Sequence, residues 1–124
     1  MKKAVGISKI IFGAVLVLSM FICVQPQMAL ADPPQDVKLA YDLNSQTLTV
    51  TITHKSSFPG FHYIKSVEIK KNGMGVITNT YDKQPDEATF VYTYKIAANK
   101  GDNLEVLVNC SLSGNKSATL DVGK

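Results

Sequence analysis

Residues 47–53 read Thr47-Leu-Thr-Val-Thr-Ile-Thr53, the most regular alternation of apolar and polar side chains in the sequence. Successive side chains of a β-strand point to opposite faces, so Leu48, Val50 and Ile52 are expected in a core, with the threonines outside. His54 follows in phase with the inward-facing set. The stretch therefore predicts a half-buried strand that delivers a histidine to the inner side.

Six further stretches carry strand patterns between turn-forming residues. Apolar residues break phase in the third strand, which predicts a β-bulge near Lys65 or Ser66. Asn72-Gly73 predicts a two-residue hairpin, because both central residues of the favoured turn need positive φ. The first strand is expected to direct Leu43 inward together with its other alternate residues. The six ranges are 37–43, 63–71, 74–81, 89–97, 104–110 and 116–122.

These short, regularly spaced strands determine the predicted fold class. About seven strands at intervals of roughly 8 to 12 residues are typical of an antiparallel two-sheet sandwich. No window shows a helical period with caps. We therefore predict an all-β, immunoglobulin-like antiparallel β-sandwich. The chain has no tryptophan, and residues 32–124 hold one cysteine, so the hallmarks of a true immunoglobulin domain are missing.

The N-terminal residues have the layout of a secretory signal. Lys2 and Lys3 precede an apolar run over residues 10–24, which Ala29-Leu-Ala31 follows as a small-residue cleavage site. The run is shorter than the roughly 20 residues of a transmembrane helix, although a retained N-terminal anchor is the alternative. We predict that residues 1–31 are a signal peptide and that residues 32–124 form the exported domain, periplasmic or secreted and free of the membrane.

Charge excludes one class of partner. The chain has 13 basic and 10 acidic residues, all basic ones are lysine, and three of them precede residue 32. Processing would therefore leave ten lysines against ten acids. Without arginine or a basic run interleaved with aromatic residues, no nucleic-acid partner is expected.

Two histidines and one cysteine form a candidate metal site. His54 and His62 are the only histidines and border one loop, and Cys110 is the only cysteine outside the predicted signal peptide. Loops of a sandwich cluster at two ends, so these residues can converge. The donors suit iron, copper or zinc. The alternatives are surface histidines, and a cysteine that is buried and inert, paired between molecules, or exposed as a thiol carrier.

Several segments resemble the iron-binding domain of the desulfoferrodoxin and neelaredoxin (superoxide reductase) family. They are Thr53-His54, His62-Tyr-Ile-Lys-Ser-Val-Glu-Ile69, Gly101-Asp-Asn-Leu-Glu-Val106 and Cys110-Ser-Leu-Ser-Gly114, and the resemblance spans roughly residues 47–122. It implies an immunoglobulin-like sandwich that binds one iron. Four histidines would bind this iron in one plane, and a cysteine would bind it along the axis. It also implies reduction of superoxide to hydrogen peroxide at the open sixth position.

Carried over by position, the resemblance implies that His54 and His62 are two of the histidine ligands and that Cys110 is the axial thiolate. Ser113 stands where the family has a further histidine, Lys55 replaces a proline, and residues 32–53 contain no histidine. The implied function is an exported, superoxide-reductase-like oxidoreductase with a partial ligand set. Its cofactor would be iron, with another transition metal open, and its electron donor a small redox partner protein.

A second interpretation makes the chain a non-catalytic exported β-sandwich binding module. The turn that carries the histidines and the Asn72-Gly73 hairpin are similar to those of the immunoglobulin-like partner subunit of the periplasmic thiosulfate-oxidising carrier complex. Such a module would act by docking a carrier. Metal content distinguishes the two interpretations, while enzymatic activity and oligomeric state stay open.

Overall fold

The computed structural model describes residues 32–124, so the predicted signal peptide lies outside the described residues. This part of the chain forms seven strands and no helix. It therefore contains no helix that is long and apolar enough to span a membrane. The strands are β1 (Asp36–Asp42), β2 (Thr47–Thr53), β3 (Ile64–Lys71), β4 (Met74–Thr80), β5 (Thr89–Lys95), β6 (Asn103–Cys110) and β7 (Asn115–Asp121).

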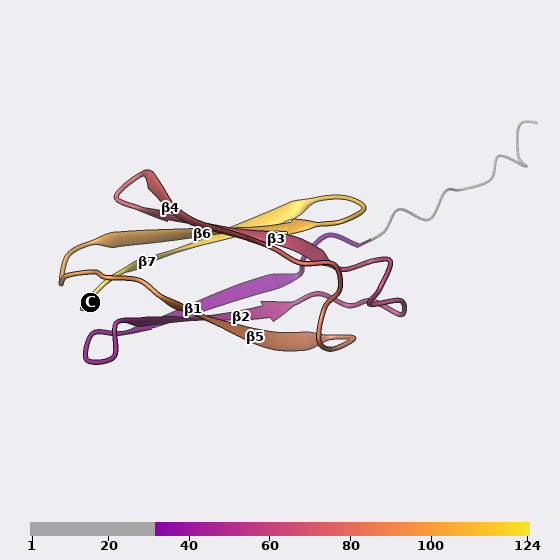
Figure 1. Cartoon of the computed structure of the whole chain (residues 1–124), viewed down its shortest axis with the longest axis horizontal. Coiled ribbons are helices and arrows are strands. Elements are labelled where there is room, and N and C mark those ends of the chain that lie inside the picture. Colours follow the sequence, from indigo (N-terminus) through magenta and orange to yellow (C-terminus); the bar gives the residue numbers. More distant parts are fainter. Residues whose placement is uncertain (1–31) are drawn as a thin grey trace, which may run out of the picture.

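The strands form two stacked sheets (Figure 1). One sheet has the order β1-β2-β5 and the other β4-β3-β6-β7, and every pairing is antiparallel. The edge strands β1 and β7 contact each other and close one side. The predicted all-β antiparallel sandwich is thereby confirmed.

The core lies between the sheets and is built by alternation. In β2, Leu48, Val50 and Ile52 are fully buried, as predicted, because they face the opposite sheet. Strand β6 belongs to that opposite sheet, and every second one of its side chains is buried, the last being Cys110. The fully buried core side chains are Leu48, Val50, Ile52, Ile64, Val67, Ile69, Leu104, Val106, Val108 and Val122.

A bulge in β3 corrects the phase of its apolar residues. Pairing with β6 shifts between Ile64 and Ser66, as the sequence predicts. The extra residue allows Ile64 and Val67 to face the same core although three positions separate them. It also sets Ile64 opposite Cys110, so the chain just before β3 lies beside the end of β6.

The expected inward position of Leu43 is wrong. Strand β1 ends at Asp42, and Leu43 is 40% exposed. The Asp42 carboxylate accepts hydrogen bonds from the backbone N–H groups of Asn44 at 2.8 Å and Ser45 at 3.4 Å, which turns the chain there. These bonds hold the pKa of Asp42 below its usual value.

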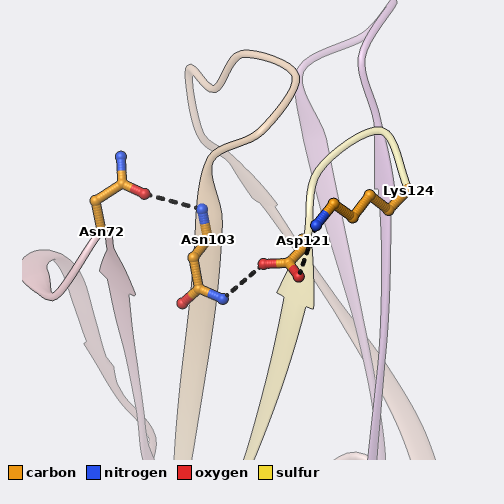
Figure 2. A network of polar contacts seen from close by, with 4 residues as sticks. All are labelled: Asn72, Asn103, Asp121 and Lys124. Carbon is orange, nitrogen blue, oxygen red and sulfur yellow. Dashed lines mark hydrogen bonds and ion pairs between the residues drawn. The ribbon is translucent and has the colours of Figure 1, made fainter.

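At the end of the sandwich opposite the histidines, asparagine side chains connect neighbouring strands (Figure 2). Asn72 and Gly73 have φ of 52° and 81°, which confirms the predicted hairpin. The Asn103 backbone N–H donates to Asn72 Oδ1 at 2.9 Å, and Asn103 Nδ2 donates to Asp121 Oδ1 at 3.0 Å. These bonds connect the β3–β4 hairpin to β6 and β7. Lys124 lies 3.9 Å from Asp121, an exposed ion pair that contributes little.

Candidate metal centre

The structure brings His54, His62 and Cys110 together at one end of the sandwich. His54 follows β2, His62 precedes β3 and Cys110 ends β6, and these strand termini share the right-hand end in Figure 1. One potential ligand atom of each residue lies within 4.8 Å of the other two. The two imidazole rings meet edge to face, with centroids 4.5 Å apart.

Burial decides between several of the alternatives. His54 is fully buried and Cys110 is 4% exposed, whereas His62 is half-buried. His54 is therefore not a surface histidine, and Cys110 lacks the exposure that a thiol carrier needs. Cys110 is a free thiol.

The loop between the histidines is held by main-chain bonds. The His54 N–H donates to the carbonyl of Ala88, and the Ser56 N–H to that of Glu87, both at 2.8 Å. The buried Ser56 hydroxyl donates to the His62 carbonyl at 2.5 Å. The loop is thus anchored to the segment before β5, which fixes His62 relative to His54.

Gln84 determines which nitrogen of His54 carries the proton. Its side chain is 3% exposed, and its Nε2 donates to the carbonyls of His54 at 2.9 Å and Asp86 at 2.8 Å. Its Oε1 accepts from the Ile64 N–H at 3.2 Å. Three partners therefore fix the orientation of the amide, and Oε1 must act as acceptor toward His54 Nδ1, 2.7 Å away.

The Nδ1–H of His54 is consequently the donor in that bond, which leaves Nε2 as the nitrogen available to another partner. Metal-binding histidines commonly donate one ring N–H to a fixed acceptor and bind the ion through the other nitrogen. Gln84 supplies that acceptor here. The buried histidine is thus held in the orientation of a ligand that binds through Nε2.

The carbonyl oxygen of Asp32 lies 3.1 Å from Nε2 of His54 and 3.1 Å from Nε2 of His62. A carbonyl oxygen is only an acceptor, and Nε2 of neutral His54 is an acceptor too. Two lone pairs facing each other in a buried site need a positive charge nearby. Either a second proton on the ring or a metal cation provides it.

The segment that carries Asp32 is fixed in place. Gln35 donates its N–H to the Thr53 carbonyl at 2.8 Å and accepts the Lys55 N–H at 3.0 Å through Oε1. Pro33 packs so closely on Gly114 that a Cβ there would lie 2.4 Å from the Pro33 Cβ. Gly114, at φ +80°, therefore makes room for the segment beside the site.

These residues fit a transition metal. Bonds of about 2.0 to 2.3 Å place two opposite ligand atoms on one ion roughly 4.4 Å apart, so separations up to 4.8 Å need only a small closing movement. Two imidazole nitrogens with a thiolate suit iron, copper and zinc. Among His, Cys, Asp and Glu residues of the described range, His54, His62 and Cys110 alone form such a group.

Sequence reasoning missed Gln84, Ser56 and the Asp32 carbonyl. Gln84 belongs to a polar, turn-rich loop whose composition predicts exposure, and a backbone carbonyl has no sequence signature. One available signal was Asp32-Pro-Pro34, a stiff segment that cannot pair as a strand. Ser113, which stands where the resemblance expects a histidine, is half-buried.

Comparison with known proteins gives a match among solved structures but none among sequences. No protein-family model matches the sequence, and neither does any curated protein. Among solved structures, superoxide reductase from Nanoarchaeum equitans matches with a TM-score of 0.44 and 12% identity, over 80% of this chain and 99% of that chain. At this identity and TM-score, the match carries no inference about the chemistry of this chain.

Proposed function

We propose that the protein is an exported metalloprotein that binds a redox-active transition metal, iron in the first instance, through His54, His62 and Cys110. The proposal extends to a superoxide-reductase-like role, which the sequence resemblance implies. The observation that supports metal binding best is how His54 is oriented beside the other two residues. A fully buried imidazole, held through Nδ1 by Gln84, lies beside a second imidazole and a thiol, with one potential ligand atom of each within 4.8 Å of the others.

Each of the three residues contributes differently. Cys110, deprotonated when it binds, supplies a soft thiolate that donates electron density to the ion. Gln84 orients His54, so its ring need not reorganise on binding. His62 is half-buried and follows Phe61, which is 68% exposed, so this side is the approach for a small oxyanion.

A bound redox-active ion supplies a one-electron change at this site. Reduction of superoxide to hydrogen peroxide consumes one electron and two protons. Solvent at the half-buried side of His62 can deliver the protons. A small redox partner protein must return the electron after each turnover.

The test compares Cys110→Ala with a matched control. Val108→Ala removes another buried side chain from β6, two residues away, without removing a ligand. We expect the wild type and the Val108 variant to contain about one metal ion per chain and to show thiolate-to-metal absorption. The Cys110 variant should lose the absorption and most of the metal. Unchanged metal content in it would remove Cys110 from the site.

A non-catalytic binding module would instead be colourless and metal-free after purification from its export compartment, even when offered Fe²⁺ under reducing conditions. That result would contradict the proposed metal site. Metal binding without superoxide consumption, measured with a chemical reductant present, would contradict the superoxide-reductase-like role alone.

The Asp32 carbonyl favours a second candidate, a copper electron-transfer site. Two histidines, one cysteine and a weak axial backbone oxygen are the donor set of blue-copper centres. The Asp32 oxygen lies 3.1 Å from the Nε2 atoms of both histidines. Elemental analysis of the natively exported protein separates the candidates, because this candidate requires copper with intense thiolate-to-copper absorption.

A further inference from the structure

We propose that cleavage before Asp32 completes the metal site, because the new α-amino group and the carbonyl oxygen of Asp32 bind the same ion as His54, His62 and Cys110. This inference rests on the proposed metal-binding function. It adds two main-chain donors to the three side-chain donors. It also makes removal of residues 1–31 a condition for tight binding.

Position is the first support. The Asp32 oxygen is equidistant from His54 Nε2 and His62 Nε2, at 3.1 Å. An ion held by Nε2 of both imidazoles therefore lies next to the main chain of Asp32. In the proposed processed protein, this residue is the first of the chain.

The conformation of Asp32 is the second support. A residue before proline is pushed to ψ of roughly +120° to +160°. This ψ turns the nitrogen of the residue to the same side as its own carbonyl oxygen, so the two atoms are roughly 3 Å apart. One ion bound by both closes a five-membered ring. Pro33 thus favours the chelating conformation of Asp32.

The segment behind Asp32 is also rigid. Pro33 and Pro34 have fixed φ, Pro34 is buried, and Pro33 contacts Gly114. The Gln35 N–H then bonds to the Thr53 carbonyl next to His54. Little conformational freedom remains to be lost when the ion binds, which favours affinity.

Cleavage changes the chemistry of the nitrogen. In the uncleaved chain, the nitrogen of Asp32 belongs to a peptide bond, and its lone pair is delocalised into the adjacent carbonyl. In the cleaved chain, the same atom is an amine with an available lone pair. The precursor therefore offers one donor fewer than the processed protein, with all side chains unchanged.

The experiment compares two exported proteins, both made from the full chain with its own residues 1–31. One is wild type, and the other carries Gly-Ser inserted between Ala31 and Asp32, which displaces the amine by two residues. Intact mass identifies each N-terminus, and melting without metal shows that both fold. Affinities for Co²⁺ and Cu²⁺ are measured by chelator competition.

We expect the wild type to begin at Asp32 and to bind at least about tenfold more tightly than the extended protein. Both should show thiolate-to-metal absorption, because Cys110 is common to them. Equal affinities, or a mature chain that begins elsewhere, would overturn the inference and leave the proposed function standing. Absence of binding in both proteins would contradict the proposed function itself.

Pro33→Ala provides a double-mutant cycle. The substitution relaxes ψ of Asp32, so it should weaken binding severalfold in the chain with the free amine and change it little in the extended chain. An equal loss in both chains would indicate a general structural effect. That result would contradict the chelate argument.

Discussion

His54 is positioned by Gln84, a buried residue that is not itself a proposed metal ligand. The Gln84 amide joins the two chain segments around the site, through the His54 and Asp86 carbonyls and the Ile64 N–H. It leaves Oε1 directed at His54 Nδ1, 2.7 Å away. A single buried side chain thus combines a structural role with the choice of histidine tautomer.

Gln84→Leu should affect both roles. It leaves buried carbonyl and N–H groups without partners, so we expect the free energy of unfolding to fall by about 2 to 4 kcal/mol. Metal affinity should fall about 10- to 100-fold, because the His54 ring loses its fixed acceptor. Urea denaturation and metal competition measure the two effects separately.

Gln46 offers the matched control. At the opposite end of β2, its Nε2 donates to the carbonyls of Leu43 and Ala98, and its Oε1 accepts the Ala98 N–H. Gln46→Leu should therefore lower stability and leave metal affinity unchanged. A similar loss of affinity in both variants would show that Gln84 acts only through stability.

The residues of the candidate site differed in how far sequence could place them. His54 was predictable because the alternation of β2 extends one step into it, and Cys110 because it continues the phase of β6. Gln84 and the Asp32 carbonyl were not predictable. A buried amide in a loop has no periodicity, and a main-chain oxygen is present in every residue.

Turns and bulges set the geometry of the strands. The Asn72-Gly73 hairpin and the bulge at Ile64/Ser66 were predictable from local sequence, because positive φ and a broken phase leave clear signals. A second shift, in the pairing of β3 with β4 between Ile69 and Lys70, was not foreseen. The order of the strands in the two sheets could not be predicted from local sequence patterns either, because it depends on pairing between distant segments.

Gly73→Ala tests the hairpin. Gly73 has φ +81°, which costs an L-residue roughly 1 to 2 kcal/mol, so we expect the free energy of unfolding to fall by about 1 kcal/mol. Gly75 lies two residues later in β4, without positive φ and with open space around its Cβ position. Gly75→Ala should be neutral or slightly stabilising in the same denaturation assay. The reverse order would contradict the turn assignment.

Three tyrosines link β5 to the residue after β4. The rings of Tyr81 and Tyr92 stack with centroids 4.3 Å apart, and the hydroxyls of Tyr81 and Tyr94 are 2.7 Å apart. Burial, with the neighbouring Tyr81, raises the pKa of Tyr92 to about 12. Burial also raises the pKa of Tyr94, together with its bond to Tyr81.

Stability should therefore fall in alkali. Between pH 10, the ordinary pKa of tyrosine, and pH 12, the unfolded chain loses the Tyr92 proton while the folded chain keeps it. The contribution is complete below pH 10 and disappears as the pH rises toward 12. Because Tyr92 is partly exposed, we expect a loss on the order of 1 kcal/mol from this residue.

Urea denaturation at several pH values between 9 and 11.5 measures this loss, and Tyr92→Phe is the control. The variant should show a shallower decline of stability with pH than the wild type. An identical pH dependence in wild type and variant would contradict the assignment to Tyr92.

The two ends of the sandwich are built differently. The end with the candidate metal site is closed by loops, by Gln84 and by the proline segment, whereas the other end is closed by the asparagine network of Figure 2. The core between them is apolar and complete without the site. We therefore expect the domain to fold without the ion, and we expect binding to act locally on the loops that carry the proposed ligands.

Metal binding should consequently stabilise the protein and slow hydrogen exchange at one end of the sandwich. At a free metal concentration of 100 times Kd, the free energy of unfolding should rise by about 2.7 kcal/mol. Hydrogen exchange by local opening should slow for the N–H groups of Ser56 and His62, whose loop the ion would fix. It should stay unchanged for those of Asn72 and Gly101, which bond at the other end. Cys110→Ala should abolish the difference. Equal protection at both ends would show that the ion acts through global stability rather than through these loops.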